Sequence, residues 1–370
     1  MQHRQTISQT QLCALLWAAL LAPAAELLPA VTLPWAGRGA WLTTLLAFPV
    51  LAGAGWVLSH AAWGRGGLPQ TICTGFGPVV GRGILILYMV WGEFLLALRL
   101  RLCAQRLLAS GERDGSLWFY LPVAALLALW MARGKLTAFA RAGQVLLAVV
   151  LTAAAVVLGL ALFQVRPEHL LPLWWQDALP VLGGTLPVCG VLGWGMFAAF
   201  LLGDTEPAKH SRRDWLIWSG LGCVLLSLEQ LVVVGNLGVS LAQRLHSPFF
   251  ALAKSVGVEG AFQRVESIVS ALWIFGDLAL LGVILFALWE MARTVWSKAE
   301  QKTVVTAAVL PAVILGMVAF PDGVSAEAAG RGIVLVGNLI LAAALPILGA
   351  GAAALSKRSK EKGTSCGQNP

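Results

Sequence analysis

Ten stretches of this chain are apolar enough and long enough to cross a lipid bilayer. No Asp, Glu, Lys or Arg occurs within residues 142–165, 178–203 or 332–356. A spanning helix needs about 20 predominantly apolar residues to cross roughly 30 Å of hydrocarbon. Only 12% of the 370 residues are charged, whereas a soluble domain carries about 25%. The sequence therefore predicts an all-α integral membrane protein with a single transmembrane domain over residues 1–370.

The ten predicted helices form two repeats, residues 12–163 and 179–355, followed by a tail at 356–370. They span residues 12–35, 40–62, 83–108, 117–132, 142–163, 179–202, 214–237, 265–291, 303–320 and 332–355. An even number of crossings places both termini on one side. That side holds sixteen of the 26 Lys and Arg residues, the opposite side eight, and the third helix two. Because Lys and Arg accumulate in cytoplasmic loops, both termini and the tail are predicted to be cytoplasmic.

The net charge of +8 is explained by this topology and by attraction to anionic membrane lipids, so nucleic-acid binding is not expected. No HExxH, GxSxG or P-loop pattern occurs, and five histidines and six cysteines are scattered without a Cys/His cluster. The lack of these motifs and the scatter of the histidines and cysteines predict that the chain has no catalytic site, metal site, disulfide or cofactor. We therefore expect a protein that is not an enzyme.

Two predicted helices, the first and the sixth, contain helix-breaking residues near mid-membrane. The first reads APAAELLP from residue 22, and the sixth reads PVLGGTLP from residue 180. Proline deletes a backbone hydrogen bond, and glycine lowers the cost of leaving helical geometry. In transporters, paired discontinuous helices present their ends to a substrate's charged groups. The offset of five helices predicts an inverted repeat with discontinuous helices 1 and 6. Proline kinks and glycine-rich packing faces are the alternative explanation. The candidate ligand-binding residues at these breaks are Ala24, Ala25, Glu26, Gly183, Gly184 and Thr185.

Acidic side chains inside the predicted spans are the other candidates. Asp277 lies near the centre of the eighth helix, Glu93 in the third and Glu229 in the seventh. An ionised carboxylate in lipid costs a few kcal/mol, so each is expected to face the protein interior or water. We predict that Asp277 and Glu93 contact a ligand ammonium group or relay a proton; a hydrogen bond to a neighbouring helix is the structural alternative. Arg99 and Arg101 are predicted to reach the outer interface from the end of their helix.

The boundary of the seventh and eighth helices carries distinctive segments: Gly238, Ser247–Lys254 (SPFFALAK), Phe262–Ile268 (FQRVESI) and Trp273. These segments closely resemble the spore germination permease family, with looser agreement at Ile7–Gln9, Ala40–Leu42 and Gly134–Arg141. These permeases are the B subunits of endospore germinant receptors, within the amino acid–polyamine–organocation superfamily.

This resemblance implies two inverted five-helix repeats with a ligand pocket between helices one, three, six and eight. It also implies a small nutrient ligand, with an amino acid expected, and assembly with a larger A subunit and a lipoprotein C subunit in the inner spore membrane. The first helix departs from the superfamily pattern, because Pro23–Glu26 stands where a glycine-rich break is expected. Two functions remain open: a nutrient sensor that signals to its partner subunits, or a secondary amino-acid transporter coupled to H⁺ or Na⁺.

Overall fold

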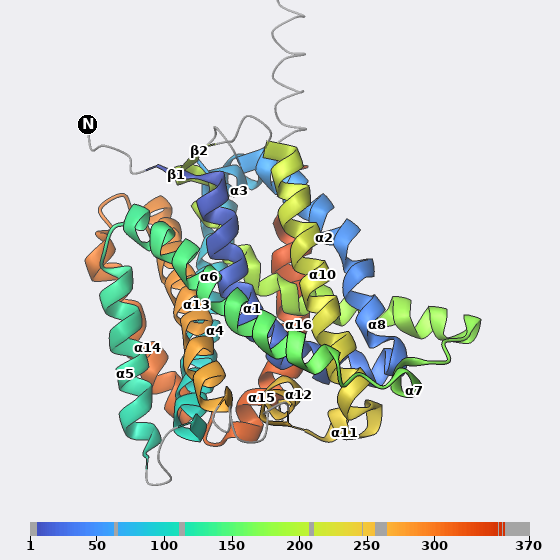
Figure 1. Cartoon of the computed structure of the whole chain (residues 1–370). Helices are drawn as coiled ribbons and strands as arrows, with labels where there is room; N and C mark the ends of the chain where they lie inside the picture. The colour runs from blue at the N-terminus through green and yellow to red at the C-terminus, as the bar shows by residue number, and fades with distance from the viewer. Residues whose placement is uncertain are drawn as a thin grey trace, which may run out of the picture.

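The structure is a computed structural model that describes residues 6–62, 66–110, 115–206, 211–245, 247–255, 265–346, 348–349 and 351. It is almost entirely helical (Figure 1). Its α-helices are α1 (Gln9–Ala36), α2 (Ala40–Ala62), α3 (Leu68–Phe76), α4 (Pro78–Ser110), α5 (Leu117–Ala132), α6 (Leu136–Leu162), α7 (Pro167–Leu170), α8 (Ala178–Leu192), α9 (Met196–Ala199), α10 (Ser211–Leu237), α11 (Val239–Arg244), α12 (Pro248–Ser255), α13 (Val265–Val295), α14 (Gln301–Val318), α15 (Gly323–Arg331) and α16 (Ile333–Asn338).

Shorter elements complete the described chain. The 3₁₀ turns are η1 (Gly37–Gly39), η2 (Trp175–Asp177), η3 (Gly193–Gly195) and η4 (Phe200–Asp204), and η5 (Leu339–Ala344) is a π-helical turn that continues α16. Two short parallel strands, β1 (Ile7–Ser8) and β2 (Thr205–Glu206), pair with Ile7 opposite Thr205. Thr6 Oγ1 also donates to Glu206 Oε1 at 2.6 Å, so the start of the chain is held against the end of the η4 segment.

Eight helical stretches among the described residues are long and apolar enough to cross a membrane. The predicted integral membrane protein of the all-α class is therefore confirmed. Two further apolar helices, Gln9–Leu21 and Leu117–Ala132, are shorter than a full span. The count of ten crossings and the cytoplasmic location of the termini stay predictions, and the tail at 356–370 lies outside the described residues.

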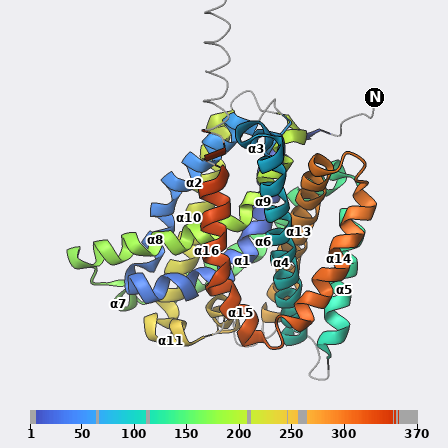
Figure 2. The ribbon, with the colours of Figure 1, turned by 180° about the vertical axis from the view of Figure 1, so that it is seen from behind.

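The helix packing follows the predicted repeats. Helix α1 packs on α8, α2 on α10, α4 on α13 and α5 on α14, so the first four helices of repeat one each contact their counterpart in repeat two. Figure 1 shows α5 and α14 on one side of the molecule and α2, α8 and α10 on the other. Seen from behind, α16 stands between these groups (Figure 2). Helix α13 lies in the interior, and almost every residue from Ala279 to Ala292 is buried.

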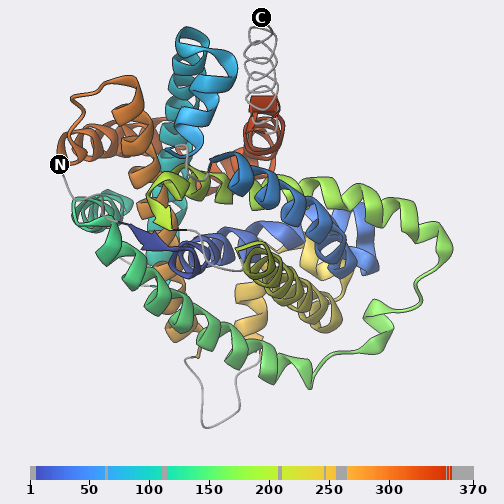
Figure 3. The same cartoon turned by 90° about the horizontal axis from the view of Figure 1, so that it is seen from above.

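The predicted unwinding of the first helix is wrong at its predicted position. Residues Ala24–Glu26 are α-helical within α1, which contains Pro23, Pro29 and Pro34. A proline removes one backbone hydrogen bond and bends a helix, but the flanking bonds keep its helical path. Figures 1 and 3 accordingly show α1 changing direction along its length, from a steep first part to a flatter second part.

The second predicted break lies later than expected. Residues Gly183–Thr185 are α-helical within α8. The α-helix ends at Leu192, and the chain continues through η3, α9 and η4. Glycine at both ends of η3 relieves the close approach there, because a Cβ on Gly193 would stand 2.7 Å from Asn338 Cβ and one on Gly195 would stand 2.7 Å from Leu16 Cδ1. The sixth helix is thus interrupted at Gly193–Gly195, about ten residues after the predicted position.

Candidate functional site

Four charged side chains from three helices meet in the interior, and we call Glu26, Arg99, Arg106 and Asp277 the charge quartet. Arg99 donates to Glu26 Oε2 at 3.0 Å and also to Asp277 Oδ1. Arg106 donates to Glu26 Oε2 at 2.6 Å and to Asp277 Oδ2 at 2.6 Å. Each arginine therefore bridges both carboxylates, so α1, α4 and α13 are joined by a closed ring of ion pairs.

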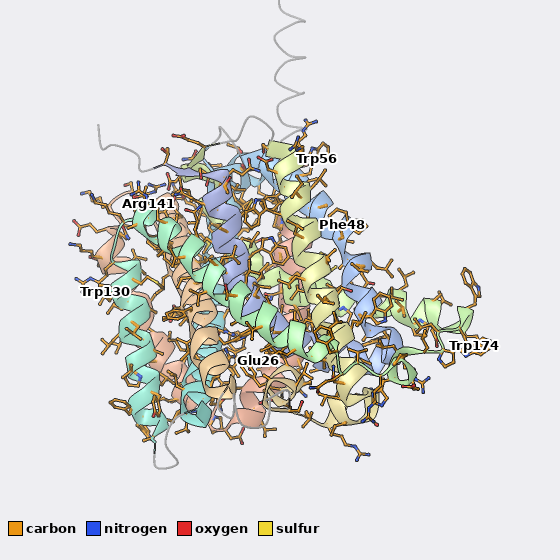
Figure 4. All side chains as sticks on the ribbon, viewed as in Figure 1. Glu26, Phe48, Trp56, Trp130, Arg141 and Trp174 are labelled. Carbon is orange, nitrogen blue, oxygen red and sulfur yellow. The ribbon has the colours of Figure 1, made fainter. Side chains whose placement is uncertain are left out.

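Helix geometry explains why both arginines reach the same acids. Arg99 and Arg106 are seven residues apart in α4, which is close to two turns, so they lie on one helix face. Glu26 lies on the second part of α1, inside the molecule (Figure 4), and Asp277 lies on α13, which packs on both α1 and α4.

Burial makes the charge balance of the quartet important. Arg99 and Asp277 are 0% exposed, and Glu26 and Arg106 are 8% and 9% exposed. An isolated charge in such surroundings is costly, and its cost is offset only by close partners of opposite sign. Two cations and two anions leave the quartet neutral. Removing one member leaves an unpaired buried charge. When a zwitterion enters, its two charges can pair with one arginine and one carboxylate of the quartet, so no buried charge is left unpaired.

An aromatic group of Phe249, Phe250 and Trp273 borders the quartet. The Arg106 guanidinium lies 5.5 Å from the centre of the Phe250 ring, within the range of a cation–π contact. The Trp273 ring lies 4.8 Å from that of Phe249 and 5.7 Å from that of Phe250. Trp273 is one helical turn before Asp277 on the same face of α13. Charged and aromatic surfaces therefore adjoin each other at this place.

The structure brings together two of the predicted site residues, Glu26 and Asp277, and Ala24 and Ala25 are buried beside Glu26 in α1. Glu93 is six residues before Arg99, about 9 Å along the helix. Its Oε1 atom is buried without a hydrogen-bond partner among the described residues, so Glu93 does not belong to the ring.

Gly183, Gly184 and Thr185 lie at a different place. A Cβ on Gly183 would contact Trp35, and one on Gly184 would contact Thr43 at 2.9 Å. Trp35 is nine residues beyond Glu26, about 14 Å of helix. The predicted segment of the sixth helix therefore packs against the α1–α2 corner, away from the charge quartet.

The arginines are the members that sequence reasoning missed. Arg99 was expected to reach the outer interface, and Arg106, at the end of the predicted third helix, was counted among the eight Lys and Arg residues on the outer side. Arg99 is instead fully buried, and Arg106 is 9% exposed within α4. Arg101 is buried as well, and its Nη2 donates to the Pro321 carbonyl at 2.9 Å. The spacing of seven between Arg99 and Arg106 was the available signal, since two cations on one helix face require two buried anions.

Glu229 in α10 is a further buried acid. It is 4% exposed, and its Oε1 has no hydrogen-bond partner among the described residues. It lines a small cavity together with Phe249 and Trp273, so the aromatic group separates it from the quartet. Within the described residues, no group of three or more His, Cys, Asp or Glu side chains is placed to hold a metal ion.

Comparison with known proteins decides the family. A family model described as "Spore germination protein" matches residues 6–321. The chain belongs to this family. The family resemblance seen in the sequence is thereby confirmed, and the chain is a transporter-like membrane protein. A search of curated proteins gives no match.

The fold of this chain is similar to that of a solved structure. The crystal structure of MhsT in complex with L-phenylalanine matches with a TM-score of 0.62, over 95% of this chain and 89% of that chain, at 14% sequence identity. At this identity the likeness establishes a common fold and nothing further. It confirms the predicted fold class, an all-α membrane protein with a transporter fold.

Proposed function

We propose that this protein is the nutrient-binding subunit of a spore germinant receptor, and that its ligand is a zwitterionic amino acid recognised at the charge quartet. The supporting observation is the ring of two arginines and two carboxylates, buried and neutral, where α1, α4 and α13 meet. The family match supports the germination role. The fold shared with a protein crystallised with L-phenylalanine supports an amino acid as ligand.

Recognition is proposed to proceed by exchange of partners. The ligand carboxylate accepts hydrogen bonds from Arg99 or Arg106 and releases Glu26 or Asp277, which then accepts from the ligand ammonium group. Because the ligand carries one charge of each sign, the number of paired charges rises while the net charge of the site stays zero. The bordering Phe249, Phe250 and Trp273 provide an apolar surface for the ligand side chain.

Signalling follows from which helices the ring joins. A ligand shifts a conformational equilibrium only by its different affinity for the two states. The unliganded ring holds the second part of α1 to α4 and α13, and ligand binding replaces one of those direct links. We propose that the resulting shift of α1 is transmitted to the A and C subunits. Glu93, Gly183, Gly184 and Thr185 stay predicted ligand contacts without such a geometric argument.

Spores test this function. The gene is deleted in a strain that has no paralogue able to replace it. Spores of this strain are expected to lose their response to at least one amino acid, measured as the fall in optical density after nutrient addition. Reintroducing the gene is expected to restore that response. Unchanged responses to every amino acid would contradict the proposal. The transporter alternative predicts instead that cells expressing the protein accumulate labelled amino acid and that dissipating the proton or sodium gradient stops accumulation.

A further inference from the structure

An apolar groove at the end of the molecule where α1 begins is separate from the charge quartet. It is lined by α1, α2, α8, the η3–α9–η4 segment and α10. Its lining includes Leu12, Leu16, Leu51, Leu58 and Leu202. Such a lining suits a hydrocarbon chain, because almost no polar group is available to orient a polar ligand there.

A second hollow adjoins the groove and carries positive charge. It is lined by Ala52, Gly53, Trp56, Arg212, Trp215 and Leu216, and Trp215 lines the apolar groove as well. Arg212 is exposed in the first turn of α10, with its guanidinium 5.8 Å from the Trp56 ring centre. Trp56 lies at the same end of the molecule as Arg141 (Figure 4). Tryptophan and arginine together are typical of the depth of lipid headgroups.

The polar atom between the two hollows is the Trp215 indole N–H. Trp215 Nε1 is buried and has no hydrogen-bond partner among the described residues. The indole lies against Gly55, where any Cβ would overlap it. The Trp215 side chain lines both hollows. The order from surface to interior is thus a cation, an indole ring and an apolar groove.

We infer that an anionic phospholipid binds here, with its phosphate at Arg212, its ester region beside the Trp215 ring and one acyl chain in the apolar groove. The order of groups in the site matches their order in the lipid molecule, and Arg212 complements the headgroup charge. Asp214 is two residues from Arg212 on α10, about 200° around the helix axis, so it lies on a different helix face. A bound chain contacts both the first part of α1 and the interruption at Gly193–Gly195, and thereby braces them together.

Photocrosslinking tests this site in the purified full chain. The probe is phosphatidylglycerol with a diazirine near the end of one acyl chain, in vesicles of phosphatidylcholine. Labelled peptides are expected to contain the groove residues of α1 and α2. Arg212→Gln is expected to reduce labelling about fivefold, the effect of one basic residue at a membrane surface, and Arg212→Lys is expected to retain it. Ala54→Trp fills the groove and is expected to abolish labelling there.

Arg141→Gln is the matched control, because Arg141 is an exposed arginine at the same end of the molecule but outside the groove. It is expected to leave labelling unchanged. Each variant is first checked for a single elution peak in size-exclusion chromatography. The proposal is overturned if a phosphatidylcholine probe of the same chain labels equally well. It is equally overturned if Arg212→Gln and Arg141→Gln act alike, or if labelling in the groove survives Ala54→Trp in a folded protein.

Discussion

Asp277→Asn is expected to lower the free energy of unfolding by about 3–5 kcal/mol, the usual effect of removing one partner from a buried ion pair. Asp277 is fully buried and accepts from both Arg99 and Arg106. Without its charge, two arginines share the single carboxylate of Glu26, so one buried positive charge is left uncompensated. The measurement is unfolding of the purified protein by increasing amounts of a denaturing detergent.

Glu168→Gln is the control for this change, because Glu168 is an exposed acid in the short helix α7. It alters the net charge of the protein by the same amount and is expected to have no measurable effect on unfolding. If the two variants unfold alike, the quartet is not the stabilising ring that the geometry indicates.

The double variant Arg99→Met with Asp277→Leu is expected to regain most of the stability lost by Asp277→Asn and still to bind amino acids far more weakly than the unaltered protein. This double change removes one charge of each sign. It leaves the neutral pair of Arg106 and Glu26, in which Nη2 of the arginine lies 2.6 Å from Oε2 of the glutamate. Replacing a buried ion pair by apolar side chains of similar size is often neutral or stabilising. Ligand recognition requires the removed groups, and losing a buried charge contact costs about 2–5 kcal/mol of binding.

The two readouts of the double variant separate a structural from a functional role. Stability is measured by the same detergent unfolding, and binding by calorimetry with those amino acids that the unaltered protein binds. At least a thirtyfold loss of affinity is expected, from the lower end of that range. A stable double variant with unchanged affinity would mean that the quartet only joins helices.

Residue patterns predicted the helices well because their signal is local. Eight of the ten predicted spans lie within a few residues of described helices, as with 40–62 against α2 and 117–132 against α5. Long apolar runs are sufficient evidence, since a chain in lipid satisfies its backbone groups most simply as helices. Short helices such as α3 and α11 were missed because they are too brief to carry a periodic pattern.

The site was predicted only in part, because it depends on contacts between distant segments. Glu26 and Asp277 were chosen as buried acids in spans, and the structure places them on the same arginines. Arg99 and Arg106 were misplaced because each lies close enough to a predicted helix end to allow an interfacial explanation. Proline and glycine patterns identified the first and sixth helices as the irregular ones. They gave neither the form of the bend in the first helix nor the position of the interruption in the sixth, since packing decides how a weakened helix deforms.

Binding of amino-acid analogues tests the central claim most directly. Calorimetry on the purified protein first identifies a bound member of the standard L-amino acids. It is then repeated with the matching amine, which lacks the carboxylate, and the matching carboxylic acid, which lacks the ammonium group. Exchange of partners in a neutral quartet predicts that each analogue binds at least tenfold more weakly than the amino acid, because each brings a net charge into a buried site. Equal affinity for the amino acid and either analogue would contradict the account.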